Sequence, residues 1–210
     1  MNIAGAHVSV TRLAIPVISM MAVVAASNVL VQHPVQYFGL SEILTWGAFS
    51  YPVAFLVNDL TNRRFGPAVT RQVVYFGFAL AILLSIWLAT PRIAIASGTA
   101  FLVGQLLDIG VFNRLRRIGW WQAPLAGSLL GSAIDTVLFF SLAFAGDADM
   151  SGATTYGSIT VPLWVGLAFF DFLVKVGCAL LALIPYGALM GWLRPWSGSS
   201  TSDTERSLAH

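Results

Sequence analysis

Charge is scarce in this chain of 210 residues. Asp, Glu, Lys and Arg make up 10% of the sequence, whereas soluble domains carry about 25%. Hydrophobic residues make up 57%. A chain of this length and composition forms one compact membrane domain and has no room for a soluble catalytic domain. The net charge is only +2, and the arginines fall in short clusters between apolar runs, so we expect no direct nucleic-acid partner.

Cysteine and histidine are also scarce. The single cysteine, Cys178, excludes a disulfide framework and a CxxC metal pair. We expect it to be a small buried hydrophobe. The three histidines, His7, His33 and His210, lie outside the apolar runs. The sequence therefore predicts no metal site and no cofactor.

Long apolar runs dominate what is present. A bilayer core needs about 20 residues of helix, and six segments qualify: about residues 13–31, 40–57, 73–89, 93–112, 123–145 and 161–190. The last exceeds one bilayer, and Pro185 should kink it or end its straight part. We predict an all-α membrane protein, with a six-helix transmembrane domain over residues 1–195. Residues 196–210, rich in Ser, Thr and charge, should form a disordered cytoplasmic tail.

The arginines predict the orientation of these helices. Nine of them flank one set of helix ends: Arg12, Arg63, Arg64, Arg71, Arg114, Arg116, Arg117, Arg194 and Arg206. The opposite side has only Arg92, together with Glu42, Asp147 and Asp149. Cytoplasmic loops carry an excess of Lys and Arg, so both termini are predicted to be cytoplasmic.

Four ionisable residues interrupt the apolar runs: Asp108, Asp135, Asp171 and Lys175. A charge at the bilayer centre costs roughly 2.5–3.5 kcal/mol on insertion scales and usually marks function. Asp171 and Lys175 have the i, i+4 spacing of a helical ion pair, and we expect this pair also to line a site. Asp135 has no basic neighbour on its own helix, which leaves it unpaired. Asp108 is near enough to the cytoplasmic arginines to extend toward them.

Helical spacing places these charges on polar faces that should point into the bundle. Gln105 shares a face with Asp108, and Ser128 and Ser132 share one with Asp135. Asp59 lies at the predicted end of the second helix, as an interfacial cap or a substrate contact.

Two glycines, Gly127 and Gly131, form a GxxxG pair, which favours close packing of helices.

Two function classes fit these features. One is a small transporter with a polar site near the midplane of the membrane. The other is an intramembrane aspartyl protease built on Asp135 and Asp171, whose carboxylates would share a proton. Lys175 weakens the protease alternative, since it would keep Asp171 ionised.

Several blocks of sequence are more specific than the composition. They are residues 27–32 (SNVLVQ), 45–52 (TWGAFSYP), 59–61 (DLT), 64–66 (RFG), 104–108 (GQLLD), 111–116 (VFNRLR), 120–121 (WW), 123–124 (AP), 135–136 (DT) and 186–187 (YG), with Asp171, Phe172, Lys175, Val176 and Pro185. Together they resemble the bacterial queuosine precursor transporter family, a six-helix group once called vitamin uptake transporters. The resemblance extends from Ser27 to Gly187.

This resemblance implies a transporter rather than an enzyme. It implies uptake across the bacterial inner membrane of 7-cyano- and 7-aminomethyl-7-deazaguanine, precursors of queuosine in tRNA. It also implies a fold similar to the substrate-binding subunits of energy-coupling-factor transporters, working without an ATPase partner. A binding subunit that does need an ATPase stays an alternative. We expect alternating access, leave proton coupling and facilitated diffusion open, and note that glycine-rich helix faces permit a homodimer.

A deazaguanine base has chemistry that these residues can match. Its guanine-like edge offers two adjacent donors to one carboxylate, an amide can serve its carbonyl, and aromatic rings can stack on its plane. We expect Asp135, Asp171 and Lys175 to form the core of the site, with Gln105 and Asp108 as a second polar wall. The full set of candidate contacts is Asn28, Trp46, Phe49, Asp59, Gln105, Asp108, Asp135, Asp171 and Lys175.

Overall fold

A computed structural model of the chain describes residues 2–3, 6–7, 10–30, 33, 35–37, 46–88, 90–193 and 195. The helices are α1 (Val10–Leu30), α2 (Gly47–Phe65), α3 (Pro67–Leu88), α4 (Pro91–Leu115), α5 (Gln122–Phe144) and α6 (Leu163–Met190). The strands form two short antiparallel pairs, β1 (Asn2–Ile3) with β2 (Ala6–His7) and β3 (Ala153–Tyr156) with β4 (Ile159–Pro162). The predicted tail at residues 196–210 lies outside the described residues, as do Glu42, Arg194 and Arg206.

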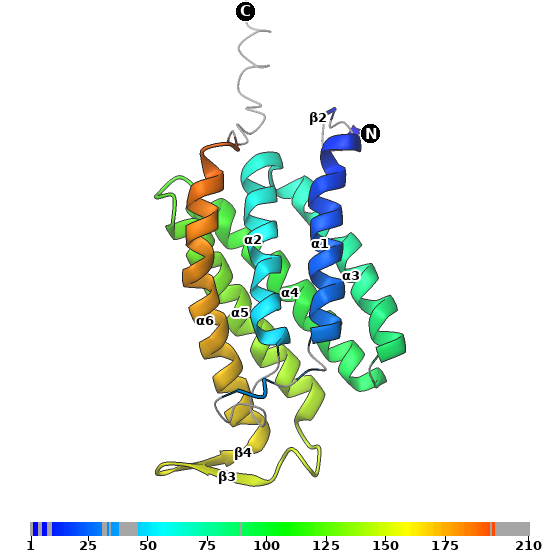
Figure 1. The fold of residues 1–210 in the computed structure, drawn as a ribbon, viewed down its shortest axis with the longest axis vertical. Helices are drawn as coiled ribbons and strands as arrows, with labels where there is room; N and C mark the ends of the chain where they lie inside the picture. Colours follow the sequence, from blue (N-terminus) through cyan, green and yellow to red (C-terminus); the bar gives the residue numbers. More distant parts are fainter. Residues whose placement is uncertain are drawn as a thin grey trace, which may run out of the picture.

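The helices lie side by side in one bundle (Figure 1). Helix α1 begins and α6 ends at the same end of this bundle, and the β3–β4 hairpin lies at the other end. Helices α1, α3, α4, α5 and α6 are long and apolar enough to cross a membrane. The prediction of an all-α membrane protein is therefore confirmed for five of the six expected spans.

Helix α2 differs most from the expectation. It was expected to end near Val57 but extends to Phe65, so Asp59 lies inside the helix instead of at its end. Hydropathy falls after Val57 because polar and charged residues follow. These side chains are nevertheless packed inside the bundle, where Asn58 and Asn62 are fully buried. The predicted end of this helix was wrong because hydropathy does not detect a helix surface that is polar but buried.

The connection before α6 contains a hairpin that was not predicted. Tyr156 pairs with Ile159 across a two-residue loop, and Gly157 has a φ of 64°, as hairpin turns of this length require. The Tyr156 ring lies against Phe170 and occupies the space that a side chain at Gly166 would need. Helix α6 then continues through Pro185 to Met190.

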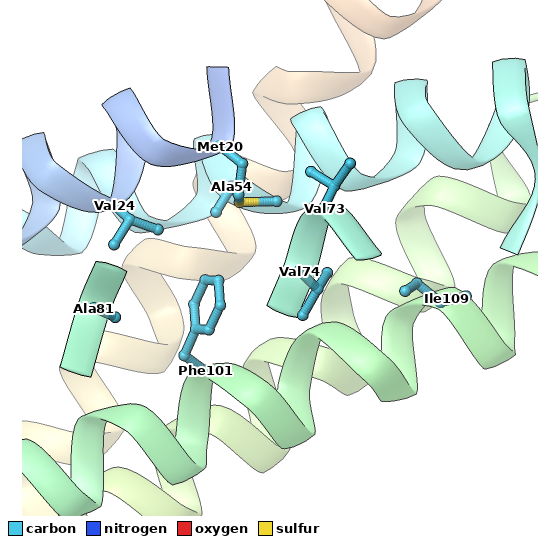
Figure 2. Packing of buried hydrophobic residues seen from close by; sticks show 8 residues of the cluster. All are labelled: Met20, Val24, Ala54, Val73, Val74, Ala81, Phe101 and Ile109. Atoms are coloured by element: carbon cyan, nitrogen blue, oxygen red, sulfur yellow. The ribbon is translucent and has the colours of Figure 1, made fainter. Parts of the chain in front are cut away.

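The main apolar core joins α1, α2, α3 and α4 (Figure 2). Phe101 of α4 lies at its centre, and Met20 of α1 fills the space beside Gly77 of α3. The complete cluster is Met20, Val24, Ala54, Val73, Val74, Ala81, Phe101 and Ile109. Large apolar side chains also cover the outer surface of the bundle, among them Ile18, Leu83, Trp87, Leu181 and Ile184, as expected for helices in contact with lipid.

Candidate functional site

A cluster of buried polar side chains lies between α2, α4 and α5. The amide of Asn58 donates to Oδ2 of Asp108 at 2.5 Å and to the backbone carbonyl of Gln105 at 3.2 Å. The Asp59 side chain neighbours both Asp108 and the Ser128 hydroxyl. We call these five residues the carboxylate–amide cluster. All are buried, and Asn58, Gln105 and Asp108 have no exposed surface.

Several polar atoms of this cluster have no hydrogen-bond partner among the described protein atoms. They are Oδ1 of Asn58, Oδ1 of Asp59, Oδ1 of Asp108, and both Nε2 and Oε1 of Gln105. Ser132, one turn after Ser128, also has a partnerless hydroxyl. Buried polar groups are nearly always paired in native proteins, and leaving one unpaired costs about 1–3 kcal/mol. The cluster therefore offers both acceptors and a donor to a polar ligand.

Two glycines of α5 allow close packing of helices at and beside this cluster. A methyl group at Gly127 would collide with Oδ1 of Asp108. One at Gly131 would lie 2.6 Å from Phe55 and 2.9 Å from the backbone carbonyl of Gly104. The GxxxG pair of α5 therefore lets two other helices approach closely, which confirms the packing prediction, and Gly127 also accommodates a carboxylate.

An extension of the cluster continues along the same helices. Asn113 donates to Oδ1 of Asn62 at 3.2 Å and to the backbone carbonyl of Ile109 at 2.6 Å. Asn58, Asn62 and Asn113 were not among the predicted contacts. The four-residue spacing of Asn58 and Asn62 was the signal that could have found this polar face of α2.

A second group of charges joins α5 to α6. Nζ of Lys175 lies 2.7 Å from Oδ2 of Asp135 and 2.6 Å from Oδ2 of Asp171. Thr136 completes the arrangement, because its hydroxyl donates to Asp171 at 2.8 Å and accepts from Lys175 at 3.1 Å. We call Asp135, Asp171 and Lys175 the ion triad. Asp135 and Lys175 are buried, and the Asp171 side chain is 17% exposed.

The structure changes three of the predictions about individual acids. Asp135 is not unpaired, because its basic partner comes from another helix. Asp108 does not extend toward the arginines: it is fully buried and accepts a hydrogen bond from Asn58. Asp59 does not cap a helix end, because it lies within α2, and it is only 2% exposed.

The other predicted contacts lie apart from these two groups or at the surface. Asn28 donates to the backbone carbonyl of Val24 and accepts from Ser85 of α3. Trp46 and Phe49 contact one another, and they are 41% and 40% exposed. In the part of the chain that the structure describes, no group of three or more His, Cys, Asp or Glu side chains could hold a metal ion.

Comparisons with a family profile and with individual proteins indicate the same family. The sequence profile described as "Putative vitamin uptake transporter" matches residues 45–90 and 85–190. The chain is 36% identical over 193 residues to the protein named "Queuosine precursor transporter" of Escherichia coli (strain K12), covering 81% of this chain and 83% of that protein. It is 34% identical over 200 residues to the "Probable queuosine precursor transporter" of Haemophilus influenzae (strain ATCC 51907 / DSM 11121 / KW20 / Rd), covering 80% of this chain and 82% of that protein.

A protein of the same name from Bacillus subtilis (strain 168) is 26% identical over 188 residues, which cover 76% of each chain. No solved structure matches the chain significantly. The family profile covers more than half of the sequence, and two relatives exceed 30% identity over four fifths of it. The chain therefore belongs to the vitamin uptake transporter family.

Proposed function

We propose that this protein imports queuosine precursors, namely 7-cyano- and 7-aminomethyl-7-deazaguanine, across the bacterial inner membrane. The observation that carries the proposal is the set of partnerless polar atoms in the carboxylate–amide cluster. The names of the relatives supply the class of substrate. Six crossing helices, with both termini in the cytoplasm, complete the proposed topology.

The chemistry of the cluster suits the edge of a deazaguanine. This edge has adjacent N–H and amino donors, and a carboxylate accepts such a pair well. Oδ1 of Asp108 and Oδ1 of Asp59 are both available as acceptors. The Gln105 amide can donate to the carbonyl of the base and accept from a further donor. Binding would give each of these buried atoms the partner it lacks in the protein.

The ion triad suits a different role. The Lys175 ammonium already pairs with both Asp135 and Asp171, and the Thr136 hydroxyl bonds to two members of the triad. The ion triad was predicted to form the core of the site, whereas we now assign base recognition to the carboxylate–amide cluster. The triad instead holds α6 against α5, and a relative movement of these two helices would fit alternating access.

Two alternatives are less well supported. An aspartyl protease needs two carboxylates that share a proton, but the Lys175 ammonium lies between Asp135 and Asp171. A binding subunit of an energy-coupling-factor transporter would share the proposed fold but would need an ATPase. Uptake measured with and without a co-expressed ATPase separates that alternative from a self-sufficient transporter.

The test is rescue of queuosine in tRNA. The chain is expressed in a host that cannot make the precursors and lacks its own importer, and the base is supplied at nanomolar concentration. We expect queuosine to return with the wild-type chain and to be lost with Asp108→Asn. Asp149→Asn, at an exposed position outside the cluster, is the matched control. No rescue by the wild-type chain, despite confirmed membrane expression, would contradict the proposal.

A further inference from the structure

An open cavity of about 190 Å³ lies at the end of the bundle where α2 and α4 end and α5 begins. Its volume is far above the roughly 10–15 Å³ that one water needs. Residues of α2, the α4–α5 connection and α6 line it, with Arg63, Arg116, Arg117 and Trp120 among them. The carboxylate–amide cluster contributes no residue to this lining.

The lining is strongly basic. Three arginines contribute to it, and no Asp or Glu is among its described residues. Nη2 of Arg63 donates to the backbone carbonyl of Met190 at 3.5 Å, and its Nε is buried with no hydrogen-bond partner among the described residues. Burial and the adjacent Arg117 guanidinium lower the pKa of Arg116. An anion in this cavity would offset the repulsion between neighbouring cations.

The remaining walls are apolar or aromatic. Phe112, Tyr186 and Trp120 line the cavity; the first two are buried, and Trp120 is 49% exposed. Ile118 and Trp121 are also exposed in the same connection between α4 and α5. Tryptophans gather where the membrane meets water. The cavity thus combines a group of arginines with exposed apolar and aromatic side chains, a combination expected at the level of lipid headgroups.

We propose that this cavity binds the phosphate group of an anionic phospholipid. Arginine guanidinium groups match the geometry of phosphate oxygens, and basic pockets between membrane helices are suited to such headgroups. A free phosphate would satisfy the arginines but would make no use of the exposed apolar residues around them. The proposal is independent of the transported substrate.

The experiment measures the melting temperature of the purified full-length chain in detergent. The chain is titrated separately with phosphatidylglycerol, with phosphatidylcholine and with inorganic phosphate. We expect phosphatidylglycerol to raise the melting temperature by several degrees, and the other two to raise it little. The double variant R116Q/R117Q should lose most of this increase. Native mass spectrometry should show the same loss as reduced retention of phosphatidylglycerol.

Arg114→Gln provides the matched control, because Arg114 is an exposed residue of the same segment that does not line the cavity. It should keep the response to phosphatidylglycerol. An equal loss in Arg114→Gln would show a general effect of charge and would overturn the proposal. An equal increase with inorganic phosphate would overturn the assignment to lipid. If R116Q/R117Q does not fold, R116K/R117K should fold and retain the preference for phosphatidylglycerol, and equal responses to the two lipids would contradict the proposal.

Discussion

Lys175 of α6 and Asp135 of α5 form a buried ion pair, with 2.7 Å between Nζ and Oδ2. The same ammonium pairs with Asp171 one turn earlier in its own helix. One cation therefore pairs with two of the acids that interrupt the apolar helices. Asp59 and Asp108 are the other two buried acids. Within the described residues, no hydrogen bond or ion pair joins either of them to a basic side chain.

Replacement of Lys175 by Met should strongly destabilise the protein. It would leave Asp135 and Asp171 without their shared cation, and breaking a buried pair in this way costs about 3–5 kcal/mol. Asp135→Asn should cost less, because Lys175 keeps Asp171 as a partner. In detergent, the melting temperature should therefore be highest for the wild type, lower for Asp135→Asn and lowest for Lys175→Met. Equal melting temperatures for all three would show that the triad does not hold α5 and α6 together.

Replacement of Gln105 by an apolar residue should have opposite effects on stability and on transport. Both polar atoms of its side-chain amide are buried without hydrogen-bond partners in the described part of the chain, and replacing unpaired polar groups by apolar ones of similar shape can be nearly neutral or stabilising. Gln105→Met should therefore preserve or raise the melting temperature while uptake of the base falls. The control is Asn62→Leu, which removes hydrogen bonds to Asn113 and Ile109 and should lower stability. Normal uptake by Gln105→Met would remove Gln105 from the site.

Two glycine substitutions should have contrasting outcomes. Gly127→Ala places a methyl group against Oδ1 of Asp108, whereas Gly110→Ala meets no atom within 4 Å. Alanine favours a helix over glycine by about 1 kcal/mol, so Gly110→Ala should leave uptake intact and unfold at the same or a higher temperature. Gly127→Ala should reduce uptake, because the carboxylate must move. Uptake assays on membranes with matched expression compare the two, and equal activity would contradict this account of Gly127.

Arg92 has a structural role that explains why an arginine lies on the otherwise arginine-poor side. Its guanidinium donates to the carbonyls of Leu142 and Ala145 at 3.0 and 2.6 Å, and so caps the end of α5. Arg92→Gln should lower the free energy of unfolding by about 0.5–1.5 kcal/mol. A cysteine-accessibility assay should find the membrane orientation unchanged. An inverted orientation would show instead that Arg92 contributes to topology.

The sequence predicts the apolar helices well, because a continuous run of about 20 apolar residues is typical of a membrane-spanning helix. It fails at α2, where Asn58 and Asn62 are polar yet buried against α4. The polar faces of α4 and α5 were also predicted correctly from helical spacing. The pairing of Lys175 with Asp135 was not predicted, because the spacing of residues along one helix does not reveal a partner on another helix. The hairpin before α6 was missed although Gly157 and its β-branched neighbours are typical of one.

Binding of 7-cyano-7-deazaguanine to the purified chain tests the central claim most directly. Isothermal titration should show one site, and Asp108→Asn should weaken binding by about 10- to 150-fold, since hydrogen bonds to a charged group contribute about 1.5–3 kcal/mol. Asp135→Asn, if folded, should bind nearly as well as the wild type. If Asp108→Asn binds normally while Asp135→Asn loses binding, the base is recognised at the ion triad and the assignment to the carboxylate–amide cluster is wrong.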